Sequence, residues 1–183
     1  MDRMIELFFQ NLGSKDKEVQ YAAYKNLLSV TEKKVDWAYE VWNQLVEDLT
    51  HRDSHRRSRA AQFLSNLAIS DPEKRMLNDF SKLWEVTKDP RFVTARHSLQ
   101  SVWRVALAGA EQKEMVIKQL VDRFEHCLEE KNYTLIRFDI LQGLRNLYDA
   151  INDEDIRRIA LDLLEKERDE KYRKKYASLW RIT

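Results

Sequence analysis

Residues that interrupt helices are scarce in this sequence. It holds only 3 glycines and 2 prolines among 183 residues, whereas hydrophobic residues make up 43% and charged residues 34%. A chain so poor in helix breakers, and so rich in leucine, glutamate, lysine, arginine and alanine, favours helices from end to end. Its length is sufficient for one domain with a continuous core. We therefore predict an all-α fold.

Cysteines and long apolar runs are scarce as well. The single cysteine, Cys127, excludes a disulfide within the chain. It fits a reducing compartment, and we expect its thiol to be packed in the core. No stretch approaches the roughly 18 apolar residues of a membrane-spanning helix. The first residues, MDRMIELFFQNLG, lack the apolar centre of a signal peptide. We expect a cytoplasmic protein that is not associated with a membrane.

Motifs for catalysis and metal binding are also lacking. The sequence has no glycine-rich phosphate loop, no HExxH pattern and no cysteine pair, and no Ser-His-Asp set follows from the spacing of its residues. His51 and His55 are four residues apart, which could place two metal ligands on one helical face. Arginines flank both histidines, however, and we expect neither a metal nor a cofactor.

What the sequence does contain is an internal repeat. Four segments align from Asp16, Asp53, Asn132 and Asp169, and a fifth from Asp89 fits less closely. In each copy three positions spaced four residues apart mark one helical face. These positions are Val19, Ala23 and Leu27; Arg56, Ala60 and Leu64; Arg91, Ala95 and Leu99; Ile136, Ile140 and Leu144; and Tyr172, Tyr176 and Trp180.

An amphipathic segment precedes each copy, with apolar residues recurring every three or four positions. The five tryptophans fall on the predicted first helices or at core-facing angles, where we expect them to pack. Asp71-Pro72 and Asp89-Pro90 resemble helix starts, and Gly13 and Gly109 stand where C-terminal caps are needed. The pattern predicts ten helices in five antiparallel pairs within one repeat domain. The approximate units are 1–31, 32–70, 71–108, 109–150 and 151–183, and the second helices span 15–31, 51–70, 88–108, 131–150 and 168–183.

The motif of this repeat is an aspartate, then Val-Arg, then an alanine and then a leucine at fixed offsets. It resembles the HEAT repeat of the armadillo-like superfamily over nearly the whole chain. The resemblance implies a right-handed α-α superhelix in which the second helix of each pair lines a concave, partner-binding face. It also implies that the arginine after the motif's valine reaches an aspartate of an adjacent turn and ties neighbouring repeats together. Arg57, Arg137 and Arg173 hold that place, while Gln20 and Phe92 replace it in the first and third units.

Charge is divided unevenly between the two sets of helices. The predicted second-helix segments sum to +12 and the remainder to −11, which together give the net charge of +1. A nearly neutral chain is therefore built from a basic layer and an acidic layer. The two layers could simply neutralise each other on a solvated surface, or the basic layer could bind an acidic partner.

A helical wheel indicates which basic residues face away from the core. Fifteen positions opposite the core in the second helices contain no aspartate or glutamate, although the chain has 31 acidic residues; one further turn adds Arg104 but also Asp149. Phe138 and Tyr21 on this face could either stack on a ligand or pack against a neighbouring helix. The candidate partner-binding residues are Tyr21, Lys25, Gln62, His97, Gln100, Arg104, Phe138, Gln142, Arg145, Lys174 and Arg181.

These residues favour a non-enzymatic interaction module that binds an acidic protein segment or nucleic acid on a basic concave face. The alternative is a nucleic-acid-binding repair enzyme, because the alkylpurine DNA glycosylases have a similar HEAT-like architecture and a basic groove. Those enzymes use a carboxylate in the groove, and Asp139 lies only at the flank of the predicted face. The oligomeric state stays open.

Overall fold

The computed structural model describes residues 1–180, and these form helices joined by turns and short loops, with no β-strand. The all-α prediction is confirmed. By their contacts the residues divide into two compact units, Met1–Ser98 and Leu99–Thr183, which are considered one at a time. Within the described part of the chain, no helix is both long and apolar enough to cross a membrane.

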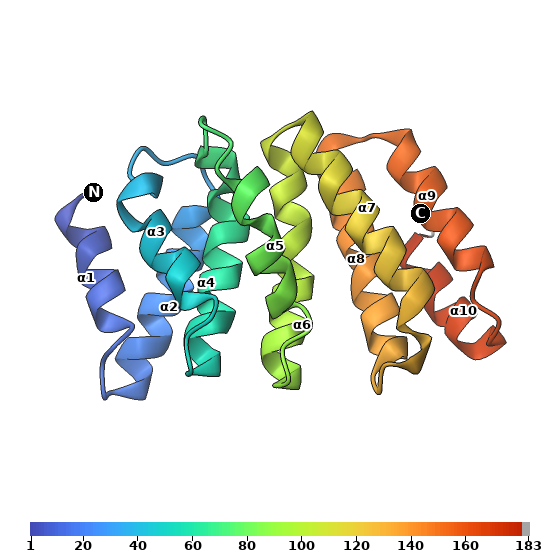
Figure 1. The fold of residues 1–183 in the computed structure, drawn as a ribbon, viewed down its shortest axis with the longest axis horizontal. Helices are drawn as coiled ribbons and strands as arrows, with labels where there is room; N and C mark the ends of the chain where they lie inside the picture. Colours follow the sequence, from blue (N-terminus) through green and yellow to red (C-terminus); the bar gives the residue numbers. More distant parts are fainter. Residues whose placement is uncertain (181–183) are drawn as a thin grey trace. The chain divides into compact units, whose positions relative to one another are not determined.

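The first unit is built from consecutive helices joined by short connections (Figure 1). Helix α1 packs on α2 and α3 packs on α4, and α4 also contacts α2 and α5. Helix α4 is therefore the centre of this unit. The helices are α1 (Arg3–Asn11), α2 (Lys17–Thr31), α3 (Ala38–Asp48), α4 (Ser54–Leu67) with the 3-10 turn η1 (Ala68–Ser70), α5 (Met76–Val86) and most of α6 (Phe92–Ser101).

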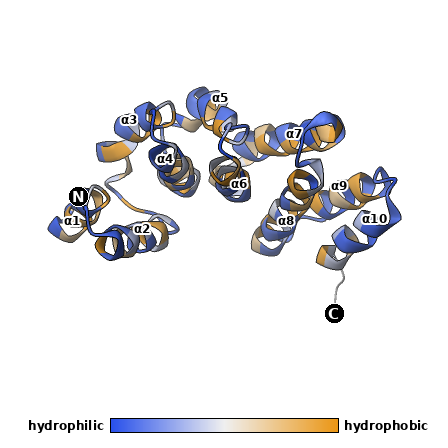
Figure 2. Cartoon of the chain, turned by 90° about the horizontal axis from the view of Figure 1, so that it is seen from below, coloured by the Kyte–Doolittle hydropathy of each residue, from blue (hydrophilic) through white to orange (hydrophobic). Residues whose placement is uncertain are grey.

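The second unit is organised around α8, which contacts α7, α9, α10 and the 3-10 helix η2. Figure 2 shows hydrophobic and hydrophilic residues alternating along each of these helices. The elements are η2 (Val102–Ala108), α7 (Ala110–His126), η3 (Cys127–Glu129), α8 (Tyr133–Ile151), α9 (Glu154–Glu165), α10 (Glu170–Ala177) and η4 (Ser178–Trp180).

Aspartate side chains fix where many of the helices begin. Asp2, Asp16, Asp53, Asp153 and Asp169 each accept hydrogen bonds from backbone N–H groups in the first turn of the helix that follows. Such a cap satisfies donors that have no partner within the helix. The recurring aspartate of the sequence repeat is thus a helix start, and the starts of α2, α4 and α10 agree with the predicted second helices within a few residues.

Aromatic and aliphatic side chains fill both cores. Trp42, Phe63 and Leu27 are fully buried in the first unit, and Phe124 and Ile140 are fully buried in the second. Trp37, Trp84 and Trp180 are buried too, whereas Trp103 is half-buried. The expectation that the tryptophans pack is therefore confirmed for four of the five. Cys127 is buried as expected, and burial raises the pKa of its thiol.

The third repeat departs most from the predicted pattern. The helix predicted over 88–108 changes at Val102 into the 3-10 helix η2, whose Val102, Val105 and Ala106 are buried. Asp71 accepts bonds from the N–H groups of Arg75 and Met76, but the N-cap of α5 is Arg75, so the helix begins four residues later than Pro72 implied. Gly109 stands between two elements, as the C-cap of η2 that was expected and also as the N-cap of α7.

Candidate interaction site

Arg57 forms the tie between repeats that the HEAT resemblance implies. Its Nε and Nη2 donate to the Oδ2 and Oδ1 of Asp89 at 2.5 and 3.0 Å, a two-pronged ion pair between α4 and the turn before α6. Its Nη1 donates to the backbone oxygens of His51 and Arg52. Although burial raises the pKa of the Asp89 carboxyl, the bonds from Arg57 and the Arg91 N–H outweigh it and lower that pKa overall.

Arg137 makes an equivalent tie in the second unit. Its Nη1 donates to Glu167 Oε2 at 2.8 Å, its Nε donates to the backbone oxygen of Phe124 at 3.0 Å, and the guanidinium lies over the Phe124 ring. Both charged side chains are only 4% exposed. The acidic partner is a glutamate rather than the expected aspartate, and it also accepts a bond from the Asp169 N–H.

The other two positions of this series behave differently. Gln20 donates its side-chain amide to the backbone oxygens of Leu12 and Ser14, so it satisfies the preceding turn but reaches no carboxylate. Arg173 is exposed, and no ion pair joins it to another described residue. Within residues 1–180, the ion pair predicted for Arg173 is therefore not formed.

The arginines on either side of Arg57 also serve the fold of the first unit. Arg56 Nη2 donates to Asp48 Oδ1 at 2.7 Å, which joins the start of α4 to the end of α3. Arg59 Nη1 donates to the backbone oxygen of Leu12, and its guanidinium lies 5.9 Å from the centre of the Tyr24 ring. Much of the basic charge assigned to this helix thus serves internal contacts.

In the first unit, the predicted outward face is interrupted at α4. Tyr21 is 63% exposed, and Lys25 and His97 are exposed as well. Gln62, by contrast, is only 9% exposed; it accepts a bond from the Tyr24 hydroxyl and donates to the Ser58 backbone oxygen. The expectation that Gln62 faces outward is wrong, because α2, α3 and α5 all pack against α4.

A signal for this burial was present in the sequence. From Ala60 to Ser70 no residue is charged, which is unusual for a helix with one solvated face. The polar side chains in this stretch have partners within the unit: the Ser65 hydroxyl donates to the Ala61 backbone oxygen at 2.7 Å, and the Asn66 amide donates to the Leu28 backbone oxygen of α2.

In the second unit, most of the predicted residues have partners within the unit. Gln100 donates to Asp139 at 3.0 Å, Gln142 donates to the side chain of Asn146, and Arg104 lies over the Trp103 ring. Arg145 forms an ion pair with Asp149 and donates to the backbone oxygen of Leu179, so it fastens η4 to α8. Arg181 lies outside the described residues.

The remaining two residues, Phe138 and Lys174, lie near a dense cluster of positive charge on α10. Lys171, Lys174 and Lys175 share one face of this helix, because they are three and four positions apart. All three are exposed, and Arg173 adds a fourth exposed cation on the opposite side. Only Lys174 of these four forms a salt bridge with a described carboxylate, a solvent-exposed contact with Glu170 at 3.8 Å.

Aromatic rings lie directly beside these lysines. The Lys175 ammonium is 5.0 Å from the centre of the Phe138 ring, and the Lys171 ammonium is 5.7 Å from that of Tyr172. Phe138 and Tyr172 are both half-buried, so part of each ring is accessible. We call Phe138, Lys171, Tyr172, Lys174 and Lys175 the α10 basic surface. Its charge and its flat apolar rings suit a negatively charged partner.

The carboxylate weighed for the glycosylase alternative is not open to a substrate. Asp139 follows Phe138 in α8 but is only 2% exposed, and it accepts the bond from Gln100. Among the residues that the structure describes, no group of three or more histidine, cysteine or acidic side chains could hold a metal ion.

Comparison with known proteins gives a likeness of fold alone. No protein-family model matches the chain, and none of the curated proteins compared with it matches either. The crystal structure of an engineered protein is similar to it, with 18% sequence identity and a TM-score of 0.53, over 96% of this chain and 76% of that one. An identity this low carries no information about activity.

Proposed function

We propose that this chain is a HEAT-like interaction module that binds an acidic partner through the α10 basic surface. The observation that carries the proposal is the exposed triplet Lys171, Lys174 and Lys175 beside the accessible rings of Phe138 and Tyr172. Because most other basic residues of the predicted face are committed to internal contacts, this surface retains the free positive charge that a partner needs.

The two arginine ties favour a stacked-repeat architecture. Arg57 and Arg137 stand at the same place in the repeat, and each joins its helix to the acidic turn about thirty residues further on. A tie repeated in this way is what a solenoid of helical pairs uses to hold successive units in register. On this interpretation the chain is a scaffold, and its function resides in its surface rather than in a catalytic centre.

Nucleic acid is the second candidate partner, and one observation favours it. A lysine beside a partly exposed aromatic ring, repeated twice along one surface, offers a phosphate contact next to a stacking platform. The burial of Asp139 gives no support to base-excision chemistry at this surface. The proposal is therefore binding, without a reaction.

Fluorescence anisotropy tests this proposal with two labelled probes, a single-stranded DNA of about 15 nucleotides and an acidic polyglutamate peptide of about 12 residues. The test variant changes Lys171, Lys174 and Lys175 together to Gln. The control changes Lys33, Lys34 and Lys82 to Gln, which removes the same charge from exposed lysines in the first unit. We expect the test variant to weaken binding at least tenfold and the control to change it less than twofold.

The steepness of the salt dependence separates the two partners, because displacement of counterions from nucleic acid makes its binding fall sharply as salt rises. Tighter binding of DNA than of the peptide, with a slope that falls in the test variant, assigns the surface to nucleic acid. Equal weakening by both triple variants would show that binding reflects overall charge, and it would refute the α10 basic surface.

A further inference from the structure

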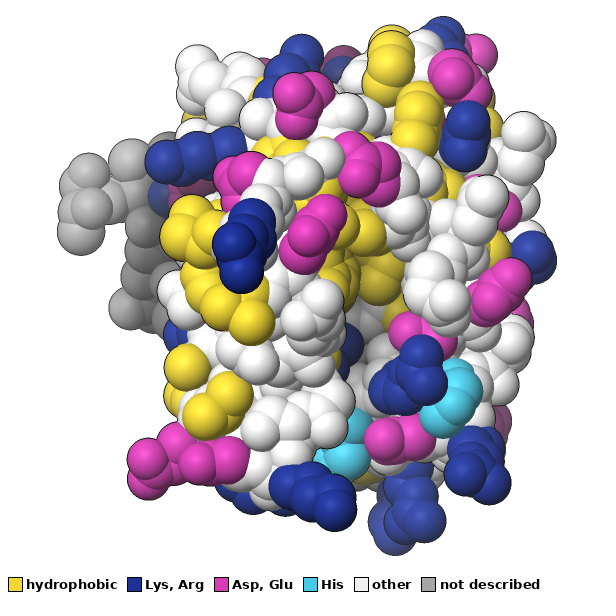
Figure 3. All heavy atoms as spheres, turned by 90° about the vertical axis from the view of Figure 1, so that its left-hand side faces the viewer, with side chains coloured by type: hydrophobic (Ala, Val, Ile, Leu, Met, Phe, Trp, Pro, Cys, Tyr) yellow, Lys and Arg dark blue, Asp and Glu magenta, His cyan; other side chains and the backbone are white. Residues whose placement is uncertain are grey.

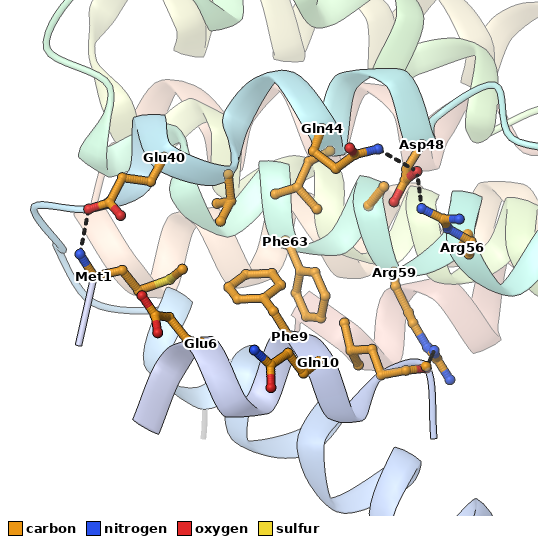
Figure 4. A pocket seen from close by; sticks show the side chains of 15 residues that line it. Met1, Glu6, Phe9, Gln10, Glu40, Gln44, Asp48, Arg56, Arg59 and Phe63 are labelled. Atoms are coloured by element: carbon orange, nitrogen blue, oxygen red, sulfur yellow. Dashed lines mark hydrogen bonds and ion pairs between the residues drawn. The ribbon is translucent and has the colours of Figure 1, made fainter. Parts of the chain in front are cut away.

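A separate cavity of about 590 Å³ opens in the first unit between α1 and α3, and residues of α4 form part of its wall (Figure 4). Its size is in the range of small-molecule sites, which run from about 300 to 1,000 Å³. We call it the α1–α3 pocket. It is lined by Met1, Glu6, Phe9, Gln10, Leu12, Gly13, Glu40, Val41, Gln44, Leu45, Asp48, Arg56, Arg59, Ala60 and Phe63.

The interior of this pocket is apolar. The Phe9 and Phe63 rings pack edge to face, 6.2 Å apart between centres, and stand in the middle of the cavity in Figure 4. Val41, Leu45 and Ala60 complete the lining beneath the charged rim. The outer surface of α1 carries Met4 and Leu7, which are 58% and 50% exposed, and Figure 3 shows apolar side chains at this end of the molecule. Met4 and Leu7 do not line the pocket, whose apolar lining comes from Phe9, Phe63 and the aliphatic residues beside them.

The two ends of the pocket carry opposite charge. Glu6 and Glu40 lie at one end, and Arg56 and Arg59 lie at the other (Figure 4). Arg56 is already neutralised by its ion pair with Asp48 at 2.7 Å. Arg59 forms no ion pair with any described carboxylate, and its one hydrogen bond goes to the backbone oxygen of Leu12. Burial lowers the pKa of Arg59, so its charge is partly stripped of water.

A half-buried guanidinium without a carboxylate partner, at the mouth of an apolar pocket, is complementary to one class of ligand. We propose that the α1–α3 pocket binds an aliphatic monocarboxylate, with the carboxylate on Arg59 and the hydrocarbon chain over Phe9 and Phe63. A carboxylate would accept charge-assisted hydrogen bonds from those N–H groups of the Arg59 guanidinium that do not bond to Leu12. The hydrocarbon chain would exclude water from the half-buried Phe9 ring.

Isothermal titration calorimetry with three probes of equal chain length tests the ligand class: dodecanoate, dodecanol and dodecylamine. We expect dodecanoate to bind saturably and at least tenfold more tightly than dodecanol, because only the acid can pair with Arg59. Dodecylamine is expected to bind more weakly still. Equal binding of the acid and the alcohol, tighter binding of the amine, or no binding of any probe would each overturn the proposal.

Three variants test the location. Arg59→Met keeps the apolar stem and removes the charge, and we expect it to weaken dodecanoate binding at least tenfold. Arg52→Met is the matched control, because Arg52 is exposed and does not line the pocket; its binding should change less than twofold. Gln10→Glu places a negative charge on the exposed rim and should also weaken binding, even if Arg59→Met fails to fold. Wild-type affinity in a folded Arg59→Met protein, or in Gln10→Glu, would refute the site.

Discussion

Breaking the buried ion pair between Arg137 and Glu167 should destabilise the second unit severely. Both side chains are 4% exposed, and the pair is 2.8 Å apart. Glu167→Gln removes the negative charge that faces the buried guanidinium, whose other neighbours, the Phe124 backbone oxygen and the Phe124 and Tyr133 rings, carry no full charge. Removing one partner of such a pair typically costs about 3–5 kcal/mol, because the other charge stays buried and unpaired. We expect the free energy of unfolding of this unit to fall by about that amount.

A double-mutant cycle measures this interaction, with Glu167→Gln, Arg137→Met and the combined variant followed by far-UV circular dichroism in urea. The combined variant buries no unpaired charge, so it should recover much of the stability that either single variant loses. We expect a coupling energy near the upper end of the usual range, about 0.5–3 kcal/mol. A loss below about 1 kcal/mol in Glu167→Gln would refute the argument, since it would place the pair in the range of solvated surface pairs.

Three further predictions concern the second unit. Gly143→Ala should stabilise it by about 0.5–1 kcal/mol in urea titrations, because a Cβ at this helical position would lie 3.6 Å from Trp103 Cβ, an ordinary contact. The Lys113 bond lowers the pKa of Asp153, so this pair adds stability above about pH 4 that is lost as pH falls through the lowered pKa. In Lys113→Met, the urea midpoint of unfolding should therefore change less between pH 6 and pH 3 than it does in the wild type. Buried Cys127 should resist iodoacetamide in the native protein and react in urea, as mass spectrometry would reveal.

Much of the fold was predictable from the sequence because the helix signals are local. Aspartates at the start of each copy act on the next turn of their own helix, so Asp16, Asp53 and Asp169 marked α2, α4 and α10 correctly. The ion pair of Arg57 could be predicted as well, because this arginine holds a fixed place in the repeat. The break of the third repeat at Val102 was not predicted, because the helix-forming residues on both sides of it continue without interruption.

The candidate site was predicted less well, because a helical wheel describes one helix against one core. It placed Gln62 on an outward face, yet α2, α3 and α5 all pack against α4, a property of the packing of several helices. It also counted Arg145 as free, although Asp149 is four residues away on the same helix and η4 lies beside it. Which cations stay unpaired depends on such partners. Among the predicted residues that the structure describes in the second unit, Gln100 and Lys174 are exposed as expected.

The most direct test of the central claim is an NMR titration of the ¹⁵N-labelled chain with the acidic peptide and the single-stranded DNA, in low salt. The account predicts saturable chemical-shift changes concentrated at Phe138 and at residues 171–175, reversed by added salt for the DNA. Changes concentrated in the first unit, or none at all in either titration, would contradict the proposal that the α10 basic surface binds the partner.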